Sequence, residues 1–369
     1  MKTLSIFFGI VILAGVALYL LRPETVPTEV SEEEPGKELP AITVIAEGLE
    51  IPWDIAFLPE GGFLVTERPG RLLLLNESGE QSEIPLDGKV LHRGEGGLLG
   101  ITLHPNFERN RLLYLYFSAT GESAQTRNRV ERYKFGETLS ERTVIIKNIP
   151  GATYHDGGRM EFGPDGLLYI TTGDATSPEN AQNLDSLGGK ILRLRDDGSI
   201  PENNPFGTAV YSYGHRNPQG LAWDSAGRLW ETEHGPTGEQ GFCCRDEINQ
   251  IKAGTNYGWP QSLGDTVRGG TAAPILHSGT DTWAPASAAI LGNSLFFGGL
   301  RGEALYEAVL DGERALELKE HFKGEFGRIR TVRVGPDGML YLTTSNRDGR
   351  GDPAPGDDRI LRVNPELLQ

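Results

Sequence analysis

Two stretches of this chain, one beginning at residue 159 and the other at residue 331, are nearly identical: Arg159–Thr172 reads RMEFGPDGLLYITT and Thr331–Thr344 reads TVRVGPDGMLYLTT. In both, a short apolar segment leads into Gly-Pro-Asp-Gly, and a second segment rich in Leu, Tyr and Thr follows. Short β-rich runs separated by a Gly-Pro-Asp-Gly turn predict a β-hairpin. Weaker copies span residues 54–67, 100–117 and 221–232, and a sixth copy without the turn signature spans 293–310.

Six such hairpins predict an all-β fold, a six-bladed β-propeller built from four-stranded blades over residues 41–369. Spread over this range, six copies give about 55 residues per blade, slightly above the usual ~40–50, so some loops must be long. A β-sandwich with chance similarity between hairpins is the alternative. The two nearly identical copies argue against it.

The N-terminus predicts a membrane anchor. Residues 4–21 carry no formal charge and lie between Lys2 and Arg22, and this length is close to what crosses a hydrocarbon core of about 30 Å. The run ends without a small-x-small cleavage site. We therefore expect a signal-anchor or transmembrane helix over residues 1–22, with the domain membrane-anchored on the extracytoplasmic (periplasmic or extracellular) side. A cleaved signal peptide and a secreted protein are the alternative.

Residues 23–40 contain four prolines, six glutamates and no aromatic residue, a composition typical of an extended acidic linker. The whole chain carries a formal charge of −16. Such a charge, without a basic stripe, argues against nucleic acid as a partner. The two cysteines, Cys243 and Cys244, are adjacent; they could form a vicinal disulfide in an oxidising compartment or remain two thiols.

The repeat also predicts where chemistry would occur. In a propeller blade, the loop entering the first strand and the loop leaving the second open on the same face, and such loops usually carry function. Counting from the turns places several polar residues in these loops. Those before first strands are Glu95, His155, Arg216, Arg328 and Arg330, and those after second strands are Asp174, His234-Gly235-Pro236 and Asn346.

These residues suggest two kinds of chemistry. An imidazole titrates near neutral pH, so His155 could act as a general base, although a histidine in a loop can also simply hydrogen-bond within a turn. Four arginines, Arg216, Arg301, Arg328 and Arg330, could pair with surface carboxylates. Arginines directed at the axis of an acidic domain favour an anionic ligand instead, because their planar forks bind carboxylates.

Two places could hold a hard cation. The Gly235-Pro236 turn could present successive carbonyl oxygens, which calcium accepts as ligands. The Glu247 carboxylate and the Tyr257 carbonyl form a second candidate pair. Taken alone, each is equally compatible with an ordinary turn.

At these residues the chain resembles the soluble aldose sugar dehydrogenases of the glucose/sorbosone dehydrogenase family, which use pyrroloquinoline quinone (PQQ) and calcium on a six-bladed propeller. The resemblance extends from Ile42 to Pro365. The segments that carry it are Gly94–Gly100 (GEGGLLG), His155–Asp174, Tyr213–Gly220 (YGHRNPQG), Glu233–Pro236 (EHGP), Asp246–Asn249 (DEIN), Asn256–Pro260 (NYGWP) and Gly327–Arg330 (GRIR).

The resemblance implies a role for each candidate. His155, oriented by Asp174, would remove the proton from the anomeric hydroxyl of an aldose, giving a lactone. The Gly235 and Pro236 carbonyls would hold a Lewis-acidic calcium, and Glu247 and Tyr257 a structural one. The remaining candidates would bind the cofactor: Glu95, Arg216, Asn217, Arg301, Arg328 and Arg330. A partner must reoxidise the cofactor, and the resemblance leaves this electron acceptor and the preferred sugar open.

The chain departs from the family pattern at two cofactor positions. Glu95 stands where Gln is frequent, and a carboxylate there would repel an anionic cofactor unless it is protonated or turned toward an arginine. Arg301 stands where Lys is common, which preserves the charge. Two other functions compete with the dehydrogenase: a non-enzymatic propeller binding protein, which would need neither His155 nor the arginines, and a calcium-dependent lactonase, which would need side-chain oxygen ligands where arginines are found.

Overall fold

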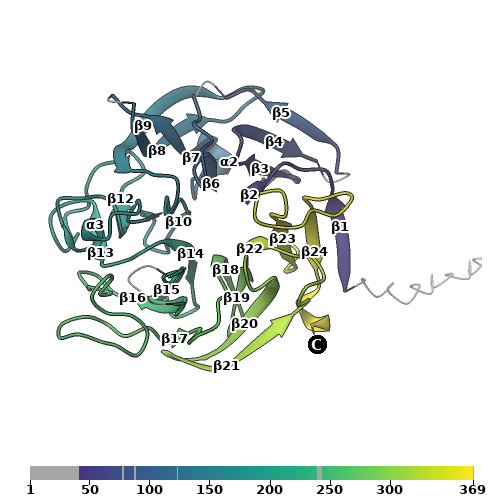
Figure 1. Ribbon diagram of the computed structural model, residues 1–369. Helices are drawn as coiled ribbons and strands as arrows, with labels where there is room; N and C mark the ends of the chain where they lie inside the picture. Colours follow the sequence, from purple (N-terminus) through teal and green to yellow (C-terminus); the bar gives the residue numbers. More distant parts are fainter. Residues whose placement is uncertain (1–40, 77–78, 87–88, 123, 239–242, 369) are drawn as a thin grey trace, which may run out of the picture. The chain divides into compact units, whose positions relative to one another are not determined.

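The computed structural model describes residues 41–368 apart from 77–78, 87–88, 123 and 239–242. The described residues form six four-stranded antiparallel sheets arranged in a ring (Figure 1). The predicted six-bladed propeller is therefore confirmed. The first blade contains β2 (Pro52–Phe57), β3 (Phe63–Glu67), β4 (Arg71–Leu75) and β5 (Gln81–Ile84), and the second contains β6 (Leu98–Leu103), β7 (Leu112–Thr120), β8 (Thr126–Lys134) and β9 (Ser140–Pro150). The third blade contains β10 (Met160–Phe162), β11 (Leu168–Thr172), β12 (Lys190–Leu194) and β13 (Val210–Tyr213), and the fourth contains β14 (Pro218–Trp223), β15 (Leu229–Glu233), β16 (Glu247–Ile251) and β17 (Leu276–His277). The fifth blade contains β18 (Pro285–Leu291), β19 (Ser294–Gly299), β20 (Ala304–Asp311) and β21 (Arg314–His321), and the sixth contains β22 (Ile329–Val334), β23 (Leu340–Thr344), β24 (Ile360–Val363) and β1 (Ile42–Ala46). Among the described residues, three short helical segments lie outside the sheets: α2 (Phe107–Asn110), α3 (Glu179–Gln182) and η2 (Pro365–Leu367).

The last blade joins the two ends of the domain. Its fourth strand is β1, which pairs antiparallel with β24, so that Ile42 lies opposite Val363. The first strand of the domain therefore completes a blade whose other three strands come from its C-terminal end. This pairing closes the ring and provides partners for backbone groups that would otherwise form an open sheet edge.

The repeat predicted five of the six hairpins at the correct strands. The two nearly identical stretches form β10–β11 and β22–β23, and the copies at 54–67, 100–117 and 221–232 form the first hairpins of their blades. The prediction for 293–310 was wrong by one strand, because this range spans β19 and β20. The first hairpin of that blade is β18–β19, which turns at Gly292 (φ +59°) without the Gly-Pro-Asp-Gly signature.

A buried ion network in the interior links three blades. Arg159 of the third blade is fully buried and lies 2.6 Å from Asp54 of the first, and Arg333 of the sixth lies 3.0 Å from the same carboxylate. Burial alone would raise the pKa of Asp54, but the two guanidinium groups hold it below its ordinary value. Removing one partner of such a network leaves an uncompensated buried charge, at a cost of about 3–5 kcal/mol.

The predicted anchor and linker, residues 1–40, lie outside the residues that the structure describes. Within the described part of the chain, none of the helices has the length and apolar character needed to span a bilayer. Cys243 and Cys244 are joined by a disulfide, which is the first of the two alternatives that the sequence left open.

Candidate active site

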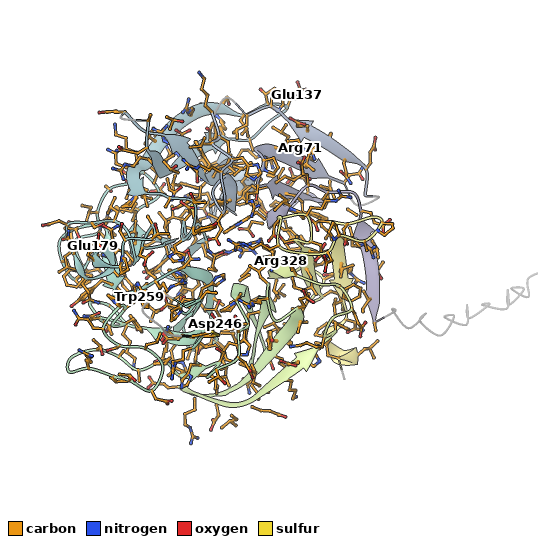
Figure 2. All side chains as sticks on the ribbon, in the orientation of Figure 1. Arg71, Glu137, Glu179, Asp246, Trp259 and Arg328 are labelled. Carbon is orange, nitrogen blue, oxygen red and sulfur yellow. A yellow bond between two sulfur atoms is a disulfide. The ribbon has the colours of Figure 1, made fainter. Side chains whose placement is uncertain are left out.

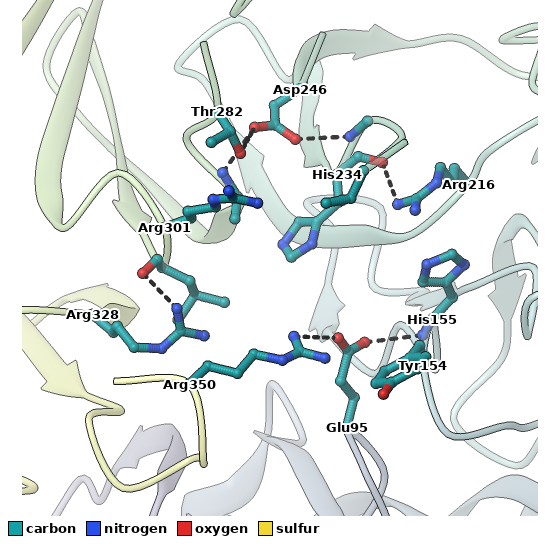
Figure 3. A pocket seen from close by; sticks show the side chains of 14 residues that line it. Glu95, Tyr154, His155, Arg216, His234, Asp246, Thr282, Arg301, Arg328 and Arg350 are labelled. Carbon is teal, nitrogen blue, oxygen red and sulfur yellow. Dashed lines mark hydrogen bonds and ion pairs between the residues drawn. The ribbon is translucent and has the colours of Figure 1, made fainter. Parts of the chain in front are cut away.

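A cavity of about 380 Å³ opens among loops of the second to sixth blades (Figure 3). Its volume falls within the range of about 300–1,000 Å³ that is typical of small-molecule and cofactor sites. The loops that line it precede first strands or follow second strands, as the repeat predicted. Seven of the residues that the sequence singled out line it: Glu95, His155, Arg216, His234, Gly235, Arg301 and Arg328. Figure 2 shows Arg328 near the middle of the ring, whereas Glu137 lies at its outer rim.

His155 and Asp174 form a hydrogen-bonded pair at one wall of the cavity. His155 Nδ1 lies 2.7 Å from Asp174 Oδ1, and the Asp174 side chain is fully buried. His155 precedes β10 and Asp174 follows β11, so one hairpin positions both residues. A carboxylate at Nδ1 selects the tautomer that carries its proton on this nitrogen, and Nε2 is then the nitrogen that accepts a proton.

Two further donors fix the Asp174 carboxylate. Trp259 Nε1 donates to Oδ2 over 2.8 Å, and the backbone N–H of Thr176 donates to Oδ1 over 2.8 Å. Three donors therefore surround this carboxylate, and rotation of its plane would break at least one of these hydrogen bonds. The sequence did not single out Trp259, which lies 85 positions from Asp174.

Glu95 is turned toward an arginine. Its Oε1 accepts a hydrogen bond from Arg350 Nη1 over 2.9 Å, and its Oε2 accepts one from the backbone N–H of His155 over 2.9 Å. Burial favours the protonated form of Glu95, but His234, Arg350 and the His155 N–H outweigh it and lower the pKa to about 2. The pKa of His234 is itself lowered to about 3, mainly by burial, so at neutral pH Arg350 provides the positive charge. The positive charge of Arg350 therefore offsets the repulsion expected between Glu95 and an anionic ligand.

The predicted arginines differ in how they are held. Arg328 donates two hydrogen bonds to Asp348 Oδ2, over 3.1 and 2.7 Å, and a third to the Leu300 carbonyl. Arg216 is buried and donates to the His234 carbonyl over 3.2 Å. Arg301 is exposed, and its guanidinium makes no hydrogen bond or ion pair with any residue that the structure describes.

Asn217 and Arg330 are buried and are not among the residues that line the cavity. Asn217 Oδ1 accepts a hydrogen bond from the backbone N–H of Gly157 over 3.1 Å and so supports the loop that carries His155. Arg330 Nη1 donates to Gln219 over 3.3 Å. Burial lowers the pKa of Arg330 to about 9. Their role as cofactor ligands stays a prediction.

Gly235 occupies a position that only glycine can fill. A Cβ atom there would collide with the carbonyl oxygens of Cys244 and Arg245. The backbone N–H of Gly235 donates to Asp246 Oδ1 over 2.8 Å, and the other oxygen of Asp246 accepts from the backbone N–H groups of Trp283 and Ala284. The carbonyl oxygens of Cys244 and Arg245 and the Asp246 carboxylate therefore lie close to Gly235. The role of the Gly235 and Pro236 carbonyls as calcium ligands stays a prediction.

The second predicted cation site lies beside an unusual cluster of buried acids. Glu247 and Tyr257 line a small pocket together. Asn249 Nδ2 lies within 3.4 Å of carboxylate oxygens of Glu231, Glu233 and Glu247. Burial, reinforced by the charge of Glu233, raises the pKa of Glu247, and Glu231 Oε1 is buried without a hydrogen-bond partner in the described part of the chain. A bound cation would offset this surplus of negative charge, so the residues fit calcium.

Comparisons with known proteins agree with this geometry. Residues 49–362 match the sequence profile of the Glucose / Sorbosone dehydrogenase family. The chain belongs to this family. The glucose/sorbosone dehydrogenase fold is shared with a PQQ-bound aldose sugar dehydrogenase from Streptomyces coelicolor, at 40% identity, a TM-score of 0.81, and coverage of 88% of this chain and 99% of that one.

Two other relatives support the same assignment. A putative oxidoreductase (glucose dehydrogenase) from Thermus thermophilus superposes with a TM-score of 0.83 at 46% identity, over 88% of this chain and 99% of that structure. The aldose sugar dehydrogenase YliI from Escherichia coli is 33% identical over 363 residues, which is 88% of this chain and 92% of that protein. The family and the class of enzyme predicted from the sequence are confirmed.

Proposed function

We propose that this glucose/sorbosone dehydrogenase oxidises the anomeric hydroxyl of aldose sugars to lactones with PQQ and calcium. The observation that carries the proposal is the His155–Asp174 pair at the wall of a cavity that is also lined by four arginines: Arg216, Arg301, Arg328 and Arg350. A non-enzymatic binding protein would not need a buried carboxylate that orients a histidine. A calcium-dependent lactonase would need several side-chain carboxylates around a central metal, whereas the two carboxylates that line this cavity, Glu95 and Asp246, already accept hydrogen bonds from the protein.

The cavity fits a polyanionic cofactor. Arg216, Arg301 and Arg328 line it, and Arg301 has no ion-pair partner among the described residues. Guanidinium groups bind carboxylates through paired, charge-assisted hydrogen bonds, and PQQ carries several carboxylates. The relative from Streptomyces coelicolor was solved in its PQQ-bound form, which supports the same cofactor here.

The residues of this chain supply the proton chemistry. Nε2 of His155 accepts the proton of the anomeric hydroxyl, and the buried Asp174 carboxylate stabilises the imidazolium that forms. When bound, PQQ would supply the hydride acceptor and calcium would supply a Lewis acid. The carbonyls of Gly235 and Pro236 would hold that calcium, and the Glu247 and Tyr257 site would hold a structural one. His155 then releases its proton to solvent, since 12% of its side chain is exposed at the cavity.

The proposal includes the location of the enzyme. An uncleaved helix at residues 4–21 would tether the propeller through the acidic linker to the extracytoplasmic side of the membrane. A disulfide between Cys243 and Cys244 agrees with an oxidising compartment.

The test is product formation by the full-length protein loaded with PQQ and calcium. We expect dye reduction that depends on an aldose, an aldonolactone detected by NMR, and a slower rate when C1 of the sugar carries deuterium. His155→Ala should abolish turnover. A wild-type protein that binds the quinone but oxidises no aldose would refute the substrate assignment.

A further inference from the structure

The carboxylate of Glu95 bridges two parts of the active site that are far apart in the sequence. Its Oε2 holds the backbone N–H of His155, and its Oε1 holds Arg350, a residue 255 positions away. The Glu95 side chain is mostly buried, at 18% exposure, whereas Arg350 is half exposed at 49%. The three residues belong to loops of the second, third and sixth blades. One side chain therefore ties three blades together at the cavity (Figure 3).

The backbone of His155 needs such a support. Its φ angle is +63°, in the left-handed region that residues other than glycine rarely adopt. Its N–H is held by Glu95 and its carbonyl accepts a hydrogen bond from Ala175 N over 3.1 Å. A non-glycine residue persists in this conformation only where its surroundings fix it. Loss of the Glu95 contact would let the backbone relax and move the imidazole away from Asp174.

The neighbouring backbone shows that the two loops are fitted to each other. The backbone N–H of Glu95 donates to the Thr153 carbonyl over 2.9 Å. Gly94 has a φ angle of +60°, and a Cβ atom there would collide with the same carbonyl. The Glu95 loop therefore docks against the chain directly before His155, and the carboxylate extends this contact to the N–H of His155 itself.

Arg350 determines which way the carboxylate points. It pairs with Glu95 and its guanidinium carbon lies 5.2 Å from the centre of the Tyr154 ring. Tyr154 precedes His155, so Arg350 contacts the His155 loop at a second point. Without Arg350, the carboxylate would be an uncompensated negative charge within a cavity that binds an anion.

We propose that Glu95, held by Arg350, is a positioning residue that clamps the His155 loop, and that it is not a ligand of the cofactor. Only the predicted change in kcat rests on the proposed function. It changes the role that the sequence resemblance implied for Glu95, and it explains how a carboxylate can stand at this position.

The clamp makes an unusual prediction for Glu95→Leu. Removing the carboxylate releases Arg350 and adds net positive charge to the cavity, so quinone affinity should stay the same or become tighter. The imidazole becomes less well placed, and a displacement of about 1 Å can cost about 100-fold in rate. We expect kcat to fall about 10- to 100-fold. A cofactor ligand would show the opposite pattern, with weaker quinone binding and a normal kcat at saturating quinone.

Three further variants make the test specific. Glu95→Gln keeps an oxygen acceptor for the His155 N–H and should restore kcat to within about threefold of wild type. Arg350→Gln leaves Glu95 unpaired and should weaken quinone binding about tenfold. Glu60→Leu removes the Glu60–Arg111 ion pair in the turn between β2 and β3 (2.6 Å) and serves as the control with unchanged kinetics. Affinity is measured by calorimetry with PQQ, and folding by thermal melting.

A measurement on the protein without cofactor separates the clamp from the proposed function. The His155 Nδ1 proton held by Asp174 should give a low-field proton NMR signal, assigned by its loss in Asp174→Asn. We expect the signal in wild type and Glu95→Gln, and its loss in Glu95→Leu. A retained signal in a folded Glu95→Leu variant, or quinone binding weakened tenfold or more, would overturn the clamp. Absence of aldose turnover in the wild type with the NMR pattern as predicted would instead refute the proposed function alone.

Discussion

The substitution Asp174→Asn removes one negative charge and preserves the shape of the side chain. In the wild type, Asp174 accepts from His155 Nδ1, Thr176 N and Trp259 Nε1. An asparagine has only one acceptor atom, so at least one of these donors must face its NH₂ group. The His155 imidazolium that forms during proton abstraction would also lose its buried counter-charge.

The size of the effect follows from these contacts. A hydrogen bond to a charged group contributes about 1.5–3 kcal/mol, and two charges about 4 Å apart interact by about 4 kcal/mol at an effective dielectric constant of 20. We take about 3–4 kcal/mol as the loss in the transition state, since the two contributions overlap. At 1.36 kcal/mol per factor of ten, kcat should fall about 10²- to 10³-fold.

The assay is dye reduction with an aldose at saturating PQQ and calcium. Quinone affinity, measured by calorimetry, should stay within about threefold of wild type because Asp174 does not line the cavity. Asp337→Asn is the control: Asp337 accepts from Tyr341 and Arg362 in the turn between β22 and β23, and it does not line the cavity. A folded Asp174→Asn enzyme with kcat within threefold of wild type would refute the role of Asp174.

Three further predictions concern stability and binding. Burial raises the pKa of Asp156 to about 7. The folded protein therefore favours the protonated side chain, which adds to the free energy of unfolding below about pH 4, and this stabilisation is lost as the pH rises through about 7. Asp156→Asn should therefore stabilise the protein at pH 8, by at most about 4 kcal/mol for three pKa units, and not at pH 4; equal melting shifts at both pH values would contradict this. Arg301→Gln should weaken PQQ binding about 10- to 100-fold by calorimetry, since one charge-assisted contact is lost, whereas Arg314→Gln, at an exposed ion pair with Asp311, should not. Calcium at 100 times its Kd should raise the free energy of unfolding by about 2.7 kcal/mol over the chelated protein, and an undiminished effect in Glu247→Gln would exclude Glu247 as a ligand.

The sequence predicted those features that local pattern encodes. The Gly-Pro-Asp-Gly hairpins identified the propeller, and counting from their turns placed His155 and Asp174 on one face, where the structure brings them to 2.7 Å. Each of these hairpins is recognisable from its own residues, and its repetition along the chain predicts the propeller. A repeated local signal is enough to predict these features.

The features that the sequence did not predict depend on contacts between distant segments. The pairing of β1 with β24 joins the two ends of the domain, and nothing in the five residues of β1 indicates their partner. Arg350 lies in a loop without a motif, so its pairing with Glu95 could not be derived. The blade formed by β18–β21 was misplaced by one strand because its first turn lacks the repeated signature.

The most direct test of the account is titration of PQQ into the calcium-loaded full-length protein and its His155→Ala variant, followed by addition of an aldose. We predict that both proteins bind the quinone with similar affinity and that only the wild type reduces it when the sugar is added. A wild-type protein that fails to bind PQQ, or a His155→Ala variant that reduces it at the wild-type rate, would contradict the account.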